Sequence, residues 1–180
     1  MLLNIITPVT RYGNLFLIEK SIKSIPESNR RWICVFDDTY IPKTLPNDCE
    51  AYSCTNSISK MGNMQRNYAL DLVEKGHIYF NDDDTEIHPF LWRRIEKLET
   101  HDFIHFSQVC KNGSLRLKGD RVMNGSIDSH NFVVSKECVA NTRWDLKRYD
   151  ADGVFAEECY KNAKSPIFIP KVLSVYNSLR

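Results

Sequence analysis

Three consecutive aspartates, Asp82 to Asp84, are the residues in this sequence best suited to chemistry. They follow the apolar run 77–80, which is typical of a buried strand, and they precede Pro89, which favours the start of a helix. Adjacent carboxylates near 4 Å repel one another by roughly 1 kcal/mol in water and about 4 kcal/mol at a protein surface. A divalent cation reverses that repulsion, and Mg²⁺ or Mn²⁺ is usually held by one or two carboxylates together with phosphates. The cluster predicts a metal and phosphate site, with a solvated acidic turn as the alternative.

Composition limits the class of protein. A chain of 180 residues suffices for one domain, and its net charge of +1 lacks the basic excess of a nucleic-acid binder. No apolar run approaches the ~20 residues of a transmembrane helix, and the first residues read as a strand rather than a leader. The six cysteines include no Cys-x-x-Cys pair, which favours reduced thiols over disulfides or zinc. We expect a cytoplasmic protein.

The periodicity of apolar residues predicts an α/β fold. Strand, helix and strand follow one another early in the chain, which favours a parallel sheet with right-handed crossovers. Expected strands cover 2–6, 32–36, 49–54, 77–80, 103–109, 114–117 and 132–134, with extended segments at 167–169 and 172–175. Expected helices cover 14–24, a stretch from about 64 to 75 capped by Gly76, 89–99, a short one after Ser135, and 150–163.

Several strand ends should meet at one edge of such a sheet. Thr7-Pro8, Asp37-Asp38 and the aspartate cluster each follow a predicted strand, so we expect five carboxylates in one crevice. The chain has seven glycines and lacks both Gly-x-Gly-x-x-Gly and a Walker loop, so metal and side chains must hold any phosphates. Arg66 opens the helix before the acidic strand, and its planar donor fork suits phosphate. An exposed helix arginine is the equally weighted alternative.

Four blocks in order form a family pattern: Ile-Ile-Thr-Pro near the start, Val-Phe-Asp-Asp-Thr, Gln-Arg-Asn-Tyr-Ala-Leu and Tyr-Phe-Asn-Asp-Asp-Asp. Together they resemble GT-A glycosyltransferases of the family 2 type over residues 3–160. The Gln-Arg-Asn and Asp-Asp-Asp segments also resemble the animal glucuronyltransferases. The resemblance implies an α/β/α sandwich with a mainly parallel central sheet. It further implies a single domain over 1–180, with a nucleotide-binding half at about 1–88 and an acceptor-binding half at about 89–180.

The resemblance also implies a nucleotide-diphosphate sugar as donor and a carbohydrate or other hydroxyl as acceptor. Thr7 and Pro8 would line the nucleoside pocket, and Asp37 would meet the base. Arg66 and Asp83 would belong to the donor site. Asp82 and Asp84 would form the Asp-x-Asp pair that holds Mn²⁺ or Mg²⁺, a Lewis acid for the departing diphosphate, with Asp84 the better candidate for direct contact.

Inverting members of this family place a carboxylate base late in the domain, at the start of a helix. Asp152 aligns best with that position, where it would take the proton from the acceptor hydroxyl. Asp150 and Glu157 remain substitutes, because this sequence has Ala-Asp where Glu-Asp is usual. For Asp150 or Asp152, a role as helix N-cap is about equally expected.

Three further residues fall where family members contact the acceptor or the donor sugar. Asp128 and His130 precede a short predicted strand, and His130 could be a third metal ligand, although a structural histidine is the more common case. Trp144 could stack on a sugar ring, although core packing is the more common role for such a residue.

Rival functions fit less well. A haloacid dehalogenase-type phosphatase also has a strand ending in Asp-x-Asp, but it needs Thr or Val two places later, where this chain has Glu86. A sugar nucleotidyltransferase needs a glycine- and arginine-rich loop after the first strand. Residues 10–13, Thr-Arg-Tyr-Gly, contain too few glycines and arginines for such a loop. A nucleotide-sugar-binding module of the same fold without catalysis stays open as an alternative.

Overall fold

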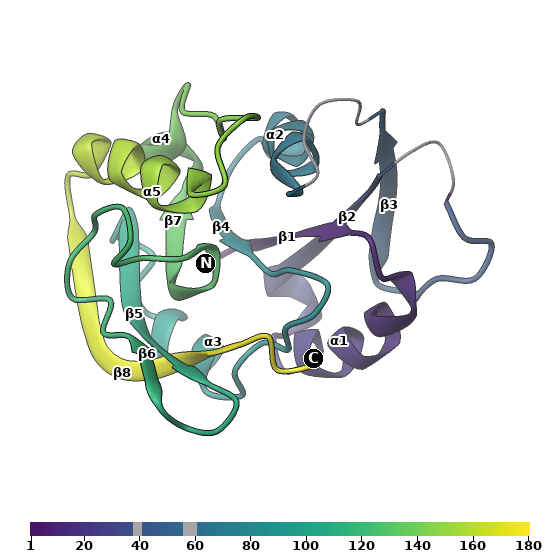
Figure 1. Ribbon diagram of the computed structural model, residues 1–180, viewed down its shortest axis with the longest axis horizontal. Helices are drawn as coiled ribbons and strands as arrows, with labels where there is room; N and C mark the ends of the chain where they lie inside the picture. The colour runs from purple at the N-terminus through teal and green to yellow at the C-terminus, as the bar shows by residue number, and fades with distance from the viewer. Residues whose placement is uncertain (38–40, 56–60) are drawn as a thin grey trace.

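The computed structural model describes residues 1–37, 41–55 and 61–180. Within them, eight strands form one sheet in the order β3-β2-β1-β4-β7-β5-β6, and β8 lies beside β5 (Figure 1). Helices cover both faces of the sheet. The predicted α/β fold class is confirmed.

The first half of the sheet is parallel, as the strand-helix-strand spacing predicts. Its strands are β1 (Leu3–Val9), β2 (Arg30–Asp37), β3 (Cys49–Cys54) and β4 (His77–Phe80). Every residue of β1 is buried, because this strand lies between β2 and β4 and both faces are covered. The bounds of β3 and β4 agree with the predicted ones.

The second half is mixed. Its strands are β5 (Phe103–Cys110), β6 (Leu115–Leu117), β7 (Phe132–Ser135) and β8 (Pro166–Tyr176). Strand β7 joins the two halves, since it runs antiparallel to both β4 and β5. Gly113 takes a φ of +83° in the predicted tight turn between β5 and β6. The sheet is therefore parallel throughout its first half and mixed in its second half, where β6 and β7 run antiparallel to β5 and β8 runs parallel to it.

Strand β8 differs from the expected pair of separate tail segments. It is one strand that pairs in parallel with β5 from Phe103 to Cys110, with register shifts around Ser107. Those shifts take up the irregular stretch between the two predicted segments. The end of the chain is therefore built into the sheet.

Two apolar clusters form the core, one on each face of the sheet. On one face lie α1 (Leu15–Ile22), which follows the short helix η1 (Tyr12–Asn14), and α3 (Leu91–Ile95). On the other lie α2 (Asn63–Leu72), α4 (Lys136–Val139) and α5 (Ala151–Asn162) (Figure 1). The predicted three-layer sandwich is confirmed. No helix in the described part of the chain has the length and apolar character needed to cross a bilayer.

Two helix predictions need correction. The helix expected over 89–99 is shorter, because only Leu91, Trp92 and Ile95 turn toward the core and Pro89 lies in the preceding turn. Helix α2 ends at Leu72, so Gly76 does not cap it. Gly76 instead starts β4 with a φ of +90°, where a Cβ would lie 2.8 Å from the Leu2 carbonyl oxygen.

Candidate active site

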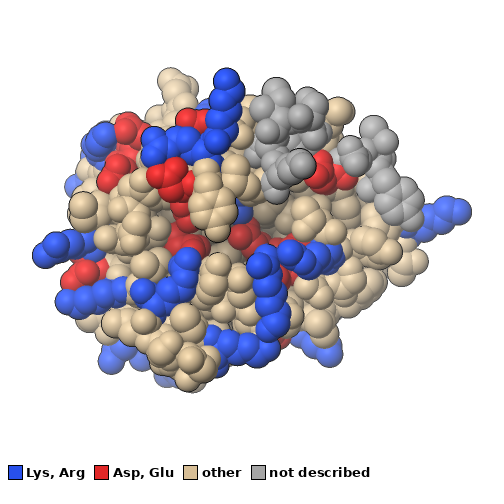
Figure 2. All heavy atoms as spheres, in the orientation of Figure 1, with Lys and Arg blue, Asp and Glu red and all other residues tan. Residues whose placement is uncertain are grey.

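A cavity of about 400 Å³ opens between the two halves of the sheet. The loop after β4, the N-termini of α2 and α5, the segment before β7 and the residues after β8 all contribute to its wall. Its lining includes five aspartates: Asp82, Asp84, Asp128, Asp150 and Asp152. It also includes three arginines: Arg66, Arg116 and Arg180. With His130 neutral, these groups give the cavity a net charge of −2. Figure 2 shows acidic side chains in the central hollow of this face, with Lys and Arg on either side.

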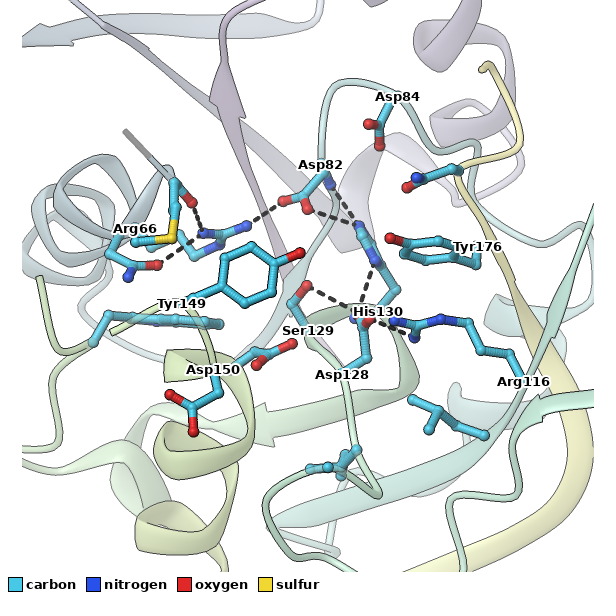
Figure 3. A pocket seen from close by; sticks show the side chains of 18 of the residues that line it. Arg66, Asp82, Asp84, Arg116, Asp128, Ser129, His130, Tyr149, Asp150 and Tyr176 are labelled. Atoms are coloured by element: carbon cyan, nitrogen blue, oxygen red, sulfur yellow. Dashed lines mark hydrogen bonds and ion pairs between the residues drawn. The ribbon is translucent and has the colours of Figure 1, made fainter. Parts of the chain in front are cut away.

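Asp82 and Arg66 form an ion pair in the wall of this cavity. Arg66 Nη2 lies 2.5 Å from Asp82 Oδ1 (Figure 3). The other terminal nitrogen of Arg66 donates to the Met61 carbonyl and to Asn63 Oδ1, at 2.8 and 3.2 Å. Arg66 is 5 % exposed, so it is not the exposed helix arginine that was the alternative. These contacts fix the Arg66 guanidinium in the wall of the cavity.

Asp83, which was expected in the donor site, is not among the residues that line the cavity. Its Oδ2 accepts hydrogen bonds from the backbone amides of Thr10 and Arg11, at 2.6 and 2.5 Å. Its Oδ1 pairs with Arg11 Nη1 at 2.9 Å. Successive residues on the connection point in different directions, and the middle aspartate is the one that ties the end of β1 to the loop.

Asp84 faces the cavity, and both of its carboxylate oxygens are engaged. Arg180 Nη2 lies 2.5 Å from Oδ2, Arg11 Nη1 lies 3.4 Å from the same oxygen, and the Thr85 hydroxyl donates to Oδ1 at 3.2 Å. The side chain of Asp84 is only 4 % exposed. Arginines from three other segments therefore relieve the repulsion within the aspartate cluster, so a cation is not needed for folding alone.

Asp82 and Asp84 supply the kind of ligand set that Mg²⁺ or Mn²⁺ takes. Both carboxylates line one cavity of negative net charge, and hard cations prefer oxygen ligands. In the described residues no three His, Cys, Asp or Glu side chains are grouped closely enough to hold a metal alone. The residues fit a site that the phosphates of a bound donor would complete, not a preformed cage.

His130 is fully used in structural contacts, which corrects the idea that it is a third metal ligand. Its Nε2 accepts a hydrogen bond from the Asp82 amide at 2.9 Å. Its Nδ1 lies 3.1 Å from Asp128 Oδ1. The ring is buried, with 1 % of the residue exposed. His130 therefore positions the backbone of the acidic loop relative to the segment before β7.

Asp128 anchors this segment. It caps the short helix η3 (Ser129–Asn131) by accepting from the His130 amide, and it pairs with Arg116 Nη1 at 2.6 Å. Burial works against its charged form, but the hydrogen bond from His130 and the Arg116 guanidinium hold the pKa of Asp128 well below its usual range. Asp128 stays ionised and already paired, so it is better placed to support its neighbours than to bind an acceptor.

Asp152 stands in the first turn of α5 and lines the cavity. Burial raises the pKa of Asp152, and the negative charge of Asp128 raises it further; the Gly153 amide and Arg66 lower it by less. A half-buried carboxylate with a raised pKa is better able to take up a proton than an ordinary aspartate.

The two substitutes for Asp152 are held in structural contacts. Asp150 pairs with Arg148 at 2.7 Å and accepts from Asn124 Nδ2 at 2.6 Å. Glu157 accepts from the Asn124 backbone amide at 2.8 Å. Asp150 occupies the N-cap position of α5 without a side-chain cap hydrogen bond. Both carboxylates therefore fasten the 124 loop to α5. Asp150 lines the cavity beside Asp152, whereas Glu157 does not line it.

Trp144 forms part of the cavity wall, but most of its ring belongs to the core. It is 2 % exposed and stacks on Phe155 with ring centroids 4.7 Å apart. The Arg66 guanidinium lies 4.6 Å from its ring centroid. Asn67 fixes its backbone from both sides, at 2.8 and 2.9 Å. The packing alternative therefore describes Trp144 better than a sugar platform.

Thr7 and Pro8 lie inside β1, which corrects their placement at an open strand end. The strand continues to Val9, because β2 still pairs with it there. Thr7 is fully buried, and its hydroxyl accepts from Trp32 Nε1 at 3.0 Å. Pro8 is buried beneath the start of α2, where a Cβ on Gly62 would lie 2.9 Å from Pro8 Cβ. Neither residue is among those that line the cavity.

Asp37 closes β2, as predicted, and is partly exposed. Its Oδ1 is buried without a hydrogen-bond partner in the described residues. Asp38, which was expected in the same crevice, lies outside those residues.

Residues that were not predicted complete the wall. Arg180, Arg116, Asn124, Tyr149 and Tyr176 come from loops or strand ends in the second half. Arg116 lies over the Tyr176 ring, 3.8 Å from its centroid. Their positions depend on long-range packing, and no local pattern marks them in the sequence.

No protein-family model and no curated protein matches the sequence. Solved structures do match the fold. S. aureus TarS 1–349 gives a TM-score of 0.76 at 16 % identity over 97 % of this chain and 60 % of its own. The same protein in complex with UDP-GlcNAc gives 0.74 at 16 % identity, over 97 % and 58 %. Mannosyltransferase PcManGT from Pyrobaculum calidifontis, with GDP-Man and Mn²⁺, gives 0.70 at 12 % identity, over 97 % and 56 %.

These matches show that the chain has the GT-A fold of nucleotide-diphospho-sugar transferases, as the resemblance implied. The chain spans about three fifths of the length of the TarS fragment.

Proposed function

We propose that this protein is a metal-dependent glycosyltransferase that moves a sugar from a nucleotide diphosphate to an acceptor hydroxyl, with inversion. One observation carries the proposal. A single cavity brings together Asp82 and Asp84 after β4, Arg66 from α2, and a carboxylate of raised pKa, Asp152, from α5. The complexes of similarly folded proteins with UDP-GlcNAc, and with GDP-Man and Mn²⁺, support a donor of this kind.

The charge of the cavity supports metal dependence. A diphosphate brings negative charge into a cavity whose side chains already sum to −2, and such an approach is repulsive without a cation. Asp82 and Asp84 would hold Mn²⁺ or Mg²⁺ there, and the bound ion would act as a Lewis acid for the departing diphosphate. Arg66 would add a positive charge beside it, from a guanidinium that α2 and Trp144 keep in place.

Asp152 would be the base. Burial and the charge of Asp128 raise the pKa of Asp152, which makes its carboxylate a stronger base for the proton of an attacking hydroxyl. Attack at the anomeric carbon from the face opposite the diphosphate inverts its configuration. A retained configuration in the product would remove Asp152 from this role.

The nucleoside would lie toward the first half of the sheet, within the proposed nucleotide-binding half at about 1–88. Asp37 is the residue we assign to the base, because it stands at the carboxyl end of β2 with a buried oxygen that lacks a partner in the described residues. The acceptor-binding half would be about 89–180.

Calorimetric titration with UDP-, GDP- and TDP-sugars, with and without Mn²⁺, tests the proposal. We expect one of them to bind at least tenfold more tightly with Mn²⁺ and to be turned over when an acceptor is present. Binding without turnover would favour the alternative, a nucleotide-sugar-binding module. No binding of any nucleotide sugar would overturn the proposal.

A further inference from the structure

Tyr149 is the most exposed large apolar side chain in the described residues, at 89 %. It nevertheless lines the cavity, three positions before Asp152. In Figure 3 its ring projects across the cavity between Arg66 and His130. An exposed aromatic ring contributes little to the core, and its place beside the proposed base indicates a role in binding.

The backbone that carries this ring is anchored on both sides. The Arg148 carbonyl accepts from Asn63 Nδ2 at 3.3 Å, and the Arg148 guanidinium donates to both carboxylate oxygens of Asp150, at 2.9 and 2.7 Å. Asn124 holds Asp150 from the other side at 2.6 Å. The exposure of Tyr149 is therefore not the result of a loose loop. Its ring is presented on a fixed support, which reduces the entropy lost on binding.

The chemistry around the ring selects one kind of ligand. Asn124, Asp150 and Asp152 line the same part of the cavity and offer an amide and carboxylates, which suit hydroxyl groups. Arg148, the residue before Tyr149, is already paired with Asp150 and is therefore not free for an anion. A pyranose ring has an apolar face of C–H groups and an edge of hydroxyls, which matches an aromatic face beside polar side chains. A phosphorylated or carboxylated ring would meet the negative charge of the cavity instead.

We propose that Tyr149 is the platform on which a neutral saccharide acceptor stacks, with its hydroxyl directed at Asp152. This inference rests on the proposed function and extends it, since it names the acceptor as a carbohydrate. The stacked ring would fix the distance and direction of the attacking hydroxyl, which general-base catalysis requires.

The test uses a panel of immobilised neutral and acidic oligosaccharides, with UDP and GDP titrated separately. Wild type, Tyr149→Ala, Tyr149→Phe and the control Tyr12→Ala are compared; Tyr12 is 54 % exposed but does not line the cavity. We expect wild type to bind neutral saccharides, Tyr149→Ala to lose at least tenfold in affinity, and Tyr149→Phe and Tyr12→Ala to stay within twofold. Nucleotide binding should be the same in all four, which also shows that the variants are folded.

The proposal that Tyr149 is a saccharide platform would be overturned if Tyr149→Ala bound saccharides as tightly as wild type. It would also be overturned if wild type bound no saccharide, or bound only acidic ones. Failure of the proposed function looks different. If no nucleotide or nucleotide sugar binds while Tyr149→Ala still loses saccharide affinity, the result supports Tyr149 as a saccharide platform and contradicts the nucleotide-sugar donor.

Discussion

Arg180 Nη2 lies 2.5 Å from Asp84 Oδ2, so a guanidinium from the segment after β8 occupies the carboxylate that we assign to the metal. The backbone supports this contact, because the Leu179 amide donates to the Asp84 carbonyl at 2.9 Å and the Ser178 hydroxyl accepts from the Glu86 amide at 2.8 Å. A divalent cation at Asp84 would compete with the positive charge of Arg180 for this carboxylate. Metal binding should therefore weaken or displace the arginine contact.

We expect Arg180→Ala to bind Mn²⁺ more tightly than wild type, because the competing cation is gone. A pair in which Arg180 is 54 % exposed contributes about 1 kcal/mol at most, so the gain should be about threefold to fivefold. Isothermal titration calorimetry with Mn²⁺ alone measures it. Arg148→Ala is the control, since Arg148 is about as exposed as Arg180 and its ion pair with Asp150 does not involve Asp84. Equal or weaker Mn²⁺ binding by Arg180→Ala would contradict the metal assignment of Asp84.

Asp152→Asn should abolish sugar transfer and leave the donor bound. Removal of a general base lowers the rate by about 10² to 10⁴, whereas the donor side of the cavity keeps all its groups. Turnover and nucleotide-diphosphate affinity are measured on the same preparation. Glu157→Gln serves as the control and should keep activity within a few fold, because Glu157 contacts the Asn124 amide and does not line the cavity. Comparable losses in the two variants would remove Asp152 from its role.

The acid limb of the pH–rate profile should lie above the ordinary aspartate pKa of about 3.9. The base must be ionised to act, and burial together with Asp128 raises the pKa of Asp152, so kcat/KM should fall as the pH drops through that raised value. Asp128→Asn removes one of the charges that raise it, and the limb should move to lower pH. A shift to higher pH in this variant would mean that another group controls the limb.

Gly153→Ala should destabilise the protein by about 1–3 kcal/mol, as overpacking does. A Cβ at this position would lie 2.5 Å from Asn124 Oδ1 and 2.8 Å from Asn124 Cα, so the 124 loop must move away from α5. Urea unfolding followed by circular dichroism gives the free energy of unfolding. Gly13→Ala is the control, because nothing lies within 4 Å of its added Cβ, and its stability should match wild type or exceed it slightly. A urea midpoint equal to that of wild type for Gly153→Ala would show that the 124 loop moves away from α5 without loss of stability.

Local patterns were enough to predict the parallel first half of the sheet and the position of the aspartate cluster after β4. The apolar run before Asp82 and the helical spacing around Arg66 place both residues near one edge, where the structure joins them. The same patterns misplaced Thr7, because the polarity of Thr7-Pro8 suggests a strand end, while pairing with β2 extends β1 three residues beyond the predicted end, to Val9.

Other parts of the site depend on contacts between distant segments. Three adjacent aspartates are alike in sequence, and only their partners distinguish them: Asp83 meets Arg11, and Asp84 meets Arg180 from nearly 100 positions away. Asp152 could be ranked above Asp150 only by the family resemblance. Asn124 binds the former, and the burial of the latter raises its pKa.

The parallel pairing of β5 with β8 sets an order for biosynthesis. All four strands of the parallel half are made within the first 80 residues, whereas β5 gains β8 only when residues 166–176 have left the ribosome. Until then β5 has an open strand edge and Asp84 lacks Arg180, so the wall of the cavity is completed only after β8 has emerged.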